Sequence, residues 1–144
     1  MNISTRTRYG IRAMVELAGS YGKGPLGIRE IAQRQSISAK YLEQLMSRLR
    51  SAGYVRSVRG AKGGYILDRS PKSITLAELF NCLEGPVVTV ECVENTSYCA
   101  QVAECATRYV WVKVQKAIEQ TFQSLTLQDL IDRVGSTKVL NYRI

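Results

Sequence analysis

Residues 27–52 hold the feature that most restricts the fold, two short helical patterns with only three residues between them. The first, LGIREIAQRQ, places apolar side chains at Ile28, Ile31 and Ala32 and polar or charged side chains around them. The second, AKYLEQLMSRLRSAG, repeats leucine at the spacing of one helical face, and Gly53 ends it. Two short helices joined by so tight a turn predict a helix-turn-helix.

The period of the sequence changes directly after this unit. YVRSV alternates apolar and polar residues, RGAKGG is rich in glycine and basic side chains, and YIL resumes an extended pattern. We expect a two-stranded hairpin with a basic tip over about 54–67. A helix-turn-helix followed by such a hairpin is the winged-helix pattern. Residues 1–80 are therefore predicted to form a winged helix-turn-helix domain that binds DNA.

The start of the second helix supplies the candidate base-reading residues. In a helix-turn-helix this helix enters the major groove, and its N-terminal residues face the base edges. Gln44 suits bidentate bonding to adenine, Lys40 suits guanine or phosphate, and Ser38 suits phosphate and caps the helix. Glu43 repels phosphates and suits only cytosine, so we expect it to restrict which sites bind. Tyr41 is expected to be partly packed. For each residue alone, the alternative is an ordinary solvated side chain.

The wing carries further candidates for DNA contact. Arg59, at the mouth of the tip, suits the narrow minor groove, and Lys62 and Arg56 suit phosphates. The alternative is a charged hairpin that only keeps the protein soluble. Residues 1–80 hold 14 Lys and Arg against 5 Asp and Glu, whereas residues 81–144 hold 6 against 7. A basic half joined to a nearly neutral half indicates that only the first half faces a polyanion.

The second half, 81–134, is expected to contain a cysteine loop over 91–105 and a long helix over about 103–124. This helix is very apolar for so small a protein, so we expect it to pack on a partner subunit as well as on its own core. A short helix follows, and residues 135–144 are expected to form a flexible tail. The predicted fold class is mainly α with a small β-hairpin wing, a winged helix-turn-helix plus a long dimerisation helix.

The expected role of the four cysteines depends on the cellular compartment of the protein. The start of the sequence lacks the apolar core of a secretory signal, and no apolar run approaches the ~18 residues of a membrane span. We therefore expect a cytoplasmic protein without membrane contact, where lasting disulfides are rare and clustered thiols bind metal or sense redox state. Cys82 lies in an apolar helical pattern and is expected to be a small core residue. Cys92, Cys99 and Cys105 are then the candidate functional thiols.

Three stretches of the chain resemble a known family. RYGIRAMVELA, ISAKYLEQLMSRLRSAGYVRSVRGAKGGYIL and a CX6CX5C pattern ahead of a tryptophan-bearing helix are similar to the bacterial regulators of the IscR kind. The nitric-oxide sensor NsrR and the cysteine-metabolism regulator CymR belong to the same wider family and are also similar. The resemblance covers residues 1 to about 134. It implies a homodimeric winged-helix transcription factor that reads a pseudo-palindromic operator in double-stranded DNA.

The resemblance also assigns roles to single residues. Ser38, Tyr41, Glu43 and Gln44 match positions of the reading helix, whereas Lys40 stands where IscR proteins often have a smaller polar residue. The matching glutamate in IscR-like proteins is associated with telling two classes of DNA site apart. The resemblance therefore implies that Glu43 discriminates between operators.

An iron–sulfur cluster is the cofactor that the resemblance implies, bound by Cys92, Cys99 and Cys105. It would be [2Fe–2S] as in IscR-like proteins or [4Fe–4S] as in NsrR-like ones, and thiolates are the ligands that such clusters need. IscR relatives place a histidine three residues after the last cysteine, but this chain has Arg108 there and no histidine at all. The fourth ligand is therefore unidentified, with Cys82, the carboxylates of the loop and an external thiol as candidates.

Alternatives to this cofactor stay open. Zinc generally takes four nitrogen or sulfur ligands, and the loop is one short. The thiols could instead form a cluster-free redox or cysteine-status switch, as in CymR-like regulators, or the chain could sense nitric oxide, as NsrR-like ones do. An electron-transfer protein is least favoured, because it would not need the basic winged half. An enzyme is not expected, because a nucleophilic thiol needs a nearby base and histidine is absent.

Overall fold

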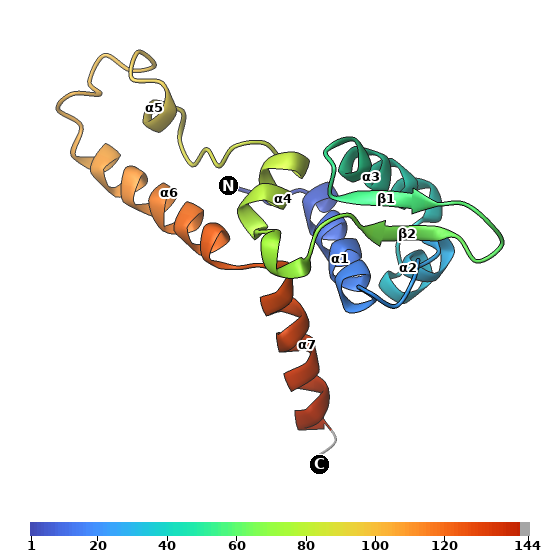
Figure 1. Cartoon of the computed structure of the whole chain (residues 1–144). Coiled ribbons are helices and arrows are strands. Elements are labelled where there is room, and N and C mark those ends of the chain that lie inside the picture. Colours follow the sequence, from blue (N-terminus) through green and yellow to red (C-terminus); the bar gives the residue numbers. More distant parts are fainter. Residues whose placement is uncertain (142–144) are drawn as a thin grey trace.

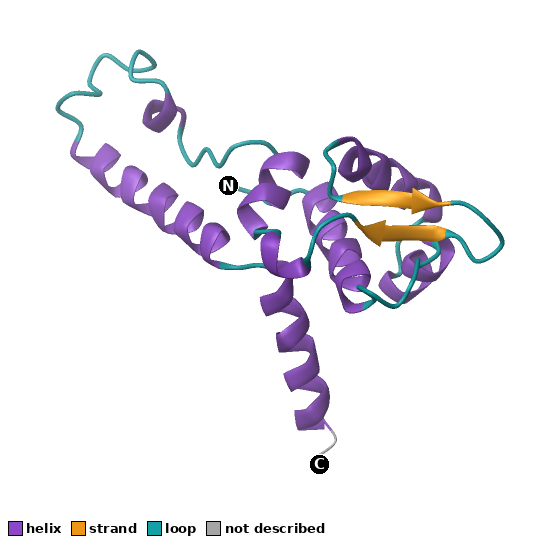
Figure 2. Ribbon diagram, viewed as in Figure 1, coloured by secondary structure: helices purple, strands orange, loops and turns teal. Residues whose placement is uncertain are grey.

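In the computed structural model, the chain folds as a mainly helical protein with one two-stranded antiparallel sheet (Figures 1 and 2). The structure describes residues 1–141, and the side chains of residues 1–136. The elements in chain order are α1 (Thr5–Gly19), α2 (Ile28–Gln35), α3 (Ala39–Ser51), β1 (Val55–Val58), β2 (Gly64–Leu67), the 3-10 turn η1 (Pro71–Ser73), α4 (Leu76–Leu83), α5 (Glu91–Glu94), α6 (Ala106–Ser124) and α7 (Leu127–Asn141). The predicted fold class is confirmed.

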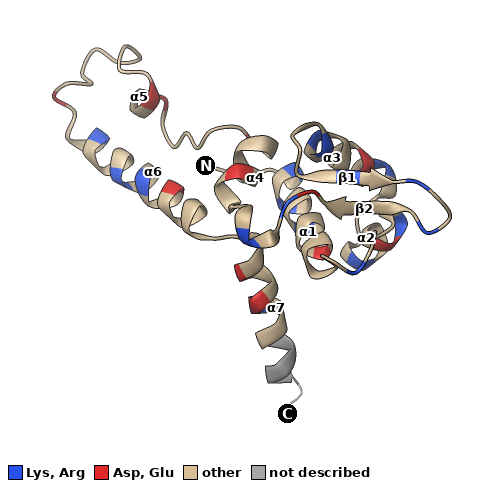
Figure 3. Ribbon diagram, viewed as in Figure 1, with Lys and Arg blue, Asp and Glu red and all other residues tan. Residues whose placement is uncertain are grey.

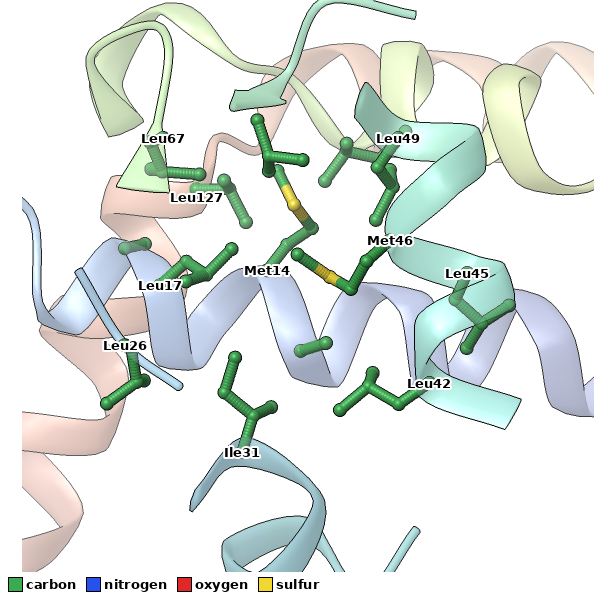
Figure 4. Close-up of a cluster of buried hydrophobic side chains, with 14 of the residues drawn as sticks. Met14, Leu17, Leu26, Ile31, Leu42, Leu45, Met46, Leu49, Leu67 and Leu127 are labelled. Carbon is green, nitrogen blue, oxygen red and sulfur yellow. The ribbon is translucent and has the colours of Figure 1, made fainter. Parts of the chain in front are cut away.

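The hydrophobic core lies between α1, α2, α3 and the hairpin, as Figure 4 shows. Burying one leucine, isoleucine or methionine side chain fully in this core stabilises the fold by roughly 1.5–3 kcal/mol. Leu127, from the last helix, is fully buried in the same core. Its backbone N–H donates to the carbonyl of Ile74 (3.0 Å), which joins the start of α7 to the segment before α4. The buried side chains include Met14, Leu17, Ile31, Leu42, Leu45, Met46, Leu49 and Leu67.

Local sequence signals set the helix boundaries. The Ser38 hydroxyl accepts from the N–H of Tyr41 (3.4 Å) and caps α3, as predicted. Ser36, directly after α2, has a φ of 53°, so the chain turns sharply between the two helices. Thr75 and Glu78 cap α4 reciprocally through side chain and backbone. These caps orient α3, which presents the candidate reading residues.

The wing pairs β1 with β2 in antiparallel register, from Val55 opposite Leu67 to Val58 opposite Gly64. A third segment joins this sheet, because Leu26 and Tyr65 exchange backbone hydrogen bonds of 3.0 and 2.9 Å. A Cβ on Gly64 would lie 2.3 Å from the Leu26 carbonyl oxygen. Close approach to this segment therefore requires glycine at residue 64.

An arm made of α5, the rest of the cysteine loop and α6 projects from the winged half (Figure 1). We call residues 91–124 the arm. α6 is about 28 Å long, and it begins three residues later than expected because residues 101–104 form turns. Among the described helices, none is both long and apolar enough to cross a membrane.

The segment expected to form a flexible tail is helical as far as residue 141. α7 continues through this segment to Asn141, and residues 142–144 lie outside the described part. The Ser136 hydroxyl donates to the Asp132 carbonyl (3.0 Å) inside the helix. No proline interrupts the segment, and Gly135 costs only about 1 kcal/mol relative to alanine, so nothing in the sequence stops the helix.

Candidate functional site

The first turns of α3 present the predicted reading residues to solvent. Ser38, Lys40, Glu43 and Gln44 are exposed. Within the described structure no side-chain partner holds Lys40, Glu43 or Gln44, so all three are free to contact a ligand. Tyr41 is half-buried, and its ring meets that of Tyr9 edge-on at 6.3 Å between centroids. The expected partial packing of Tyr41 is thus confirmed, while the DNA contacts of all five residues stay predictions.

A basic residue that the sequence did not single out supports this surface from α1. The Arg12 guanidinium lies 5.3 Å from the centre of the Tyr9 ring. It also donates to the side-chain and backbone oxygens of Gln35 at 2.7 and 2.6 Å, which ties α1 to the end of α2. Figure 3 shows Lys and Arg on α2, α3 and the loop between β1 and β2. The positive charge of the first half therefore gathers around the helix-turn-helix and the wing.

The wing tip places Arg59 and Lys62 in the exposed loop between β1 and β2. Neither has a side-chain partner in the described region. Arg56 differs, because its Nε lies 3.3 Å from Asp68 Oδ1. Such an exposed pair is worth about 0–1 kcal/mol and is easily exchanged for another anion. The predicted phosphate contact of Arg56 therefore competes with Asp68, whereas the predicted minor-groove contact of Arg59 and phosphate contact of Lys62 have no competitor among the described residues.

The three candidate thiols lie in different settings along the cysteine loop. Cys92 is half-buried on α5, Cys99 is exposed between turns, and Cys105 is half-buried at the N-cap of α6. All three are free thiols. The Thr107 hydroxyl lies 3.2 Å from the Cys105 sulfur, and this hydrogen bond is the largest cause of a pKa lowered below the usual range for a thiol. The backbone N–H of Arg108 is the second cause. A lowered pKa favours the thiolate, which is the form that binds metal.

The loop supplies suitable donors but does not assemble them within one chain. Among the residues that the structure describes, no three Cys, Asp or Glu side chains lie close enough to hold a metal ion. By chemistry, three thiols fit an iron–sulfur cluster or another thiophilic group. Arg108 stands where relatives carry histidine and cannot act as a ligand, because a guanidinium has no acceptor atom. Its Nε instead donates to the Cys92 carbonyl at 2.9 Å.

Cys82 lies outside this loop. It is half-buried on α4 and packs against the hydrophobic core, so the expectation of a core residue holds in part. Burial raises the pKa of the Cys82 thiol, and the nearby Arg48 opposes this rise. A thiol kept protonated by burial is a poor metal ligand. The structure therefore gives no support for Cys82 as the fourth ligand.

α6 has two different faces. Phe122 stacks on Phe80 of α4, with 4.7 Å between ring centroids, so it packs within the chain. Gln115, seven residues earlier, is buried on this inner side, and the sequence reading missed it. The sequence did contain a signal for its burial, because Gln115 lies two helical turns before Phe122 and therefore on the same side of the helix. Outside this packed side, α6 exposes large apolar side chains, most fully at Tyr109, Val110 and Val114, and Trp111 at the edge of that side is also exposed.

Comparison with known proteins places this geometry among bacterial regulators. Residues 3–133 match the family model Rrf2, described as an iron-dependent transcriptional regulator. The regulator CymR of Bacillus subtilis is 44% identical over 130 residues, which cover 90% of this chain and 89% of that protein. The solved structure of B. subtilis CymR, the global cysteine regulator, has a TM-score of 0.82 at 41% identity and covers 92% of this chain and 98% of its own. The structure of T. potens IscR has a TM-score of 0.76 at 40% identity and covers 93% and 88%.

Proposed function

The chain belongs to the Rrf2 family of transcriptional regulators, and from this premise we propose that it controls transcription in response to the state of an iron–sulfur cluster on Cys92, Cys99 and Cys105. The observation that carries the proposal is the placement of three free thiols on one exposed loop that runs directly into α6. The iron-dependent description of the matching family model agrees with it. The genes controlled would be those of iron–sulfur biogenesis or related pathways.

Double-stranded DNA in the cytoplasm is the proposed partner of the winged half. Arg59 and Lys62 contact the minor groove and phosphates, while the start of α3 enters the major groove. Gln44 and Lys40 read bases or phosphates there, and Glu43 excludes operators that offer it no cytosine. A pseudo-palindromic operator follows if two copies bind together, because the two-fold axis of the protein then matches that of the site.

A second copy of the chain is the proposed partner of α6. Val110 is 48% exposed and Val114 41% exposed in the single chain, one helical turn apart on one face, and Tyr109 and Trp111 are exposed on either side of them. A contiguous apolar surface of this kind on a small protein marks an interface. Covering it with the same face of a second copy gives a two-fold dimer that sets the spacing of the two reading helices.

Regulation in this proposal acts through the order of the cysteine loop. When bound, the cluster would supply a link among three thiols that the free loop lacks. Residues 95–104 would then be held beside the start of α6 instead of contacting solvent alone. A more rigid arm biases the orientation of the two reading helices, because α6 joins the loop to the dimer interface.

A cluster-free thiol switch is the second candidate. It is favoured by the hydrogen bonds that lower the pKa of Cys105 and by the separation of the three thiols, none of which belongs to a preassembled metal-binding group among the described residues. The similarity to CymR, whose structure is described as that of a global cysteine regulator, agrees with it. In this form no metal is bound, and two of the thiols would form a disulfide while a cellular oxidant such as a peroxide takes up the two electrons and two protons and is reduced to water.

Anaerobic purification separates the two candidates. We expect a coloured protein with visible absorption bands and with iron and sulfide in equal amounts, and we expect Cys92→Ala, Cys99→Ala and Cys105→Ala each to lose them. Cys82→Ala should keep them. A colourless chain that takes up no iron on anaerobic reconstitution would overturn the cluster and leave the thiol switch. Mössbauer spectroscopy distinguishes [2Fe–2S] from [4Fe–4S].

Operator selection by Glu43 needs a separate experiment. We expect Glu43→Ala to bind additional DNA sites in the cluster-free state, because the repulsive carboxylate is gone. Selection of bound fragments from a random DNA library would reveal them. An unchanged set of bound sequences would contradict the proposed role.

A further inference from the structure

The buried face of α6 contains a polar side chain where an apolar one is the norm. Every residue of α6 is described, and among its 19 residues only Gln115 is buried, at 5% exposure. Burying an amide without partners costs roughly 1–3 kcal/mol. Such a residue needs compensation by hydrogen bonds, and the bonds that Gln115 makes indicate its role.

All four hydrogen-bonding positions of the Gln115 amide are occupied. Oε1 accepts from the backbone N–H of Thr89 (3.2 Å) and from its hydroxyl (3.3 Å). Nε2 donates to Glu94 Oε1 (2.5 Å) and to Glu119 Oε1 (3.2 Å). Glutamine has two acceptor sites and two N–H donors, so nothing is left unpaired. Three of the four bonds reach the segment before and after Cys92.

The partners leave little choice of residue at this position. A backbone N–H can only donate and a carboxylate can only accept, so the amide oxygen must face Thr89 and the nitrogen must face Glu94 and Glu119. Glutamate in place of Gln115 would bring a third carboxylate against the other two. Leucine would leave the Thr89 N–H without its acceptor. A glutamine fits both requirements at once.

Arg108 makes a second attachment on the same side of α6. It lies seven residues before Gln115, which is two helical turns, so both side chains extend from one face. Its Nε donates to the Cys92 carbonyl (2.9 Å), and its Nη2 lies 3.5 Å from the Val93 carbonyl. These carbonyls lie in the short helix α5 and have few partners within it. Residues 89–94 are therefore attached to α6 at two points.

The rest of the cysteine loop lacks such attachments. Residues 95–101 are all exposed, and the backbone hydrogen bonds within this segment, such as that from the Tyr98 N–H to the Asn95 carbonyl, are local turns. Cys99 belongs to this segment. Cys92, by contrast, is half-buried between the Gln115 and Arg108 contacts. The loop thus has one fixed thiol and one that depends on local turns alone.

We propose that Gln115 is the positioning residue that fixes the Cys92-bearing turn on α6. It is the contact through which the state of the cysteine loop reaches the dimerisation helix. This inference rests on the proposed function for its regulatory meaning, since the cysteine loop is taken to be the sensor. The positioning itself concerns the free chain and requires no bound cluster.

Cysteine labelling of the cluster-free, full-length protein tests the positioning. In Gln115→Leu and Gln115→Glu we expect iodoacetamide to label Cys92 about tenfold faster than in the parental chain, because the segment opens more often. Amide hydrogen exchange over 89–94 should rise by a similar factor. The rate at Cys99 should stay constant. Gln120→Leu, an exposed glutamine on the same helix, is the matched control and should change neither.

An exchange of the two side chains provides a rescue. Gln115→Glu combined with Glu94→Gln keeps the net charge and again places a donor against an acceptor, so we expect Cys92 labelling to return toward the parental rate. Loss of packing alone would not be repaired by a change on the exposed Glu94. Should Gln115→Leu unfold, Glu94→Ala removes one of the same bonds from the exposed side and should raise the rate about threefold.

Parental labelling rates at Cys92 in both Gln115 variants would overturn the inference, as would a double variant as fast as Gln115→Glu. Iron content after anaerobic reconstitution is a separate readout and should fall in Gln115→Leu, because one ligand is no longer held in place. If the parental chain takes up no iron, the cluster is wrong, while the labelling rates still decide the role of Gln115.

Discussion

The winged half and the arm obey different physical rules. α3 has 13 residues and buries four of them, whereas α6 has 19 residues and buries one, which is polar. The winged half is closed by apolar packing and by backbone pairing between Leu26, β1 and β2. The arm is held by a few hydrogen bonds and by the stacking of Phe122 on Phe80, and it exposes several large apolar side chains. A well-packed winged half is thus joined to an arm that has little apolar packing of its own.

The largest expected effect compares one substitution in each region. Leu49→Ala removes a fully buried side chain of α3 and should lower the free energy of unfolding by about 2–5 kcal/mol, since the cavity adds to the lost transfer energy. Tyr98→Ala, at 63% exposure in the loop, should change it by less than about 0.5 kcal/mol. Urea denaturation measures both. Similar losses for the two variants would mean that the arm is as tightly packed as the winged half.

The second prediction tests whether the exposed apolar side chains of α6 form the proposed dimer interface. Val114→Glu puts a charge on the apolar face and should weaken the dimer about a hundredfold, from a burial penalty of roughly 3 kcal/mol. Lys116→Glu, an exposed position on the same helix, is the control. Sedimentation velocity over a range of concentrations gives the monomer fraction. A Val114→Glu protein that stays dimeric would show that α6 is not the interface.

DNA binding separates two residues of α3 by their salt dependence. Gln44→Ala should weaken binding to the preferred operator by about 1–3 kcal/mol and leave the salt slope intact, because a base contact releases no counterion. Lys40→Ala, if Lys40 contacts phosphate, should lower the slope of log affinity against log salt by about 1. Fluorescence anisotropy at several salt concentrations measures both. Equal slopes in the parental protein and Lys40→Ala would place Lys40 on a base or away from DNA.

Glu84, at the end of α4, is bonded to the start of α1 and gives the smallest effect. Its carboxylate accepts hydrogen bonds from the hydroxyls of Ser4 and Thr7 at the start of α1. These bonds lower the pKa of the Glu84 carboxyl below its usual range, and the bond from Ser4 has the largest effect. A lowered pKa in the folded state stabilises the protein above the unfolded value of about 4.3, and this contribution disappears as the pH falls through the folded value.

Acid titration of Glu84→Gln checks this sign. The parental chain should lose stability more steeply than Glu84→Gln below pH of about 4, and the two curves should run parallel near neutrality. Glu104→Gln in the exposed loop is the control and should follow the parental curve. Thermal unfolding at fixed pH steps provides the data. A steeper acid loss in Glu84→Gln than in the parental chain would contradict the assignment.

Much of the winged half was predictable because its signals are local. The Ser38 cap, the Thr75–Glu78 capping box and the change of period after α3 each act over a few residues, and all appear in the structure. The backbone pairing of Leu26 with Tyr65 was not predictable, because these residues are far apart in sequence and Leu26 lies in no recognisable strand. The exposure of the candidate reading residues followed from the helical period alone.

The sequence by itself determined the winged-helix unit, the basic first half and the chemical identity of the thiols, because periodicity, charge and side-chain type are properties of neighbouring residues. Only the tertiary structure decided how the cysteine loop is attached. The contacts of Gln115 with Thr89 and of Arg108 with the Cys92 carbonyl join residues 16 to 26 positions apart. Such contacts depend on the path of the chain between the two residues. Hydrophobic burial and loop geometry determine that path, and it cannot be predicted from a local sequence pattern.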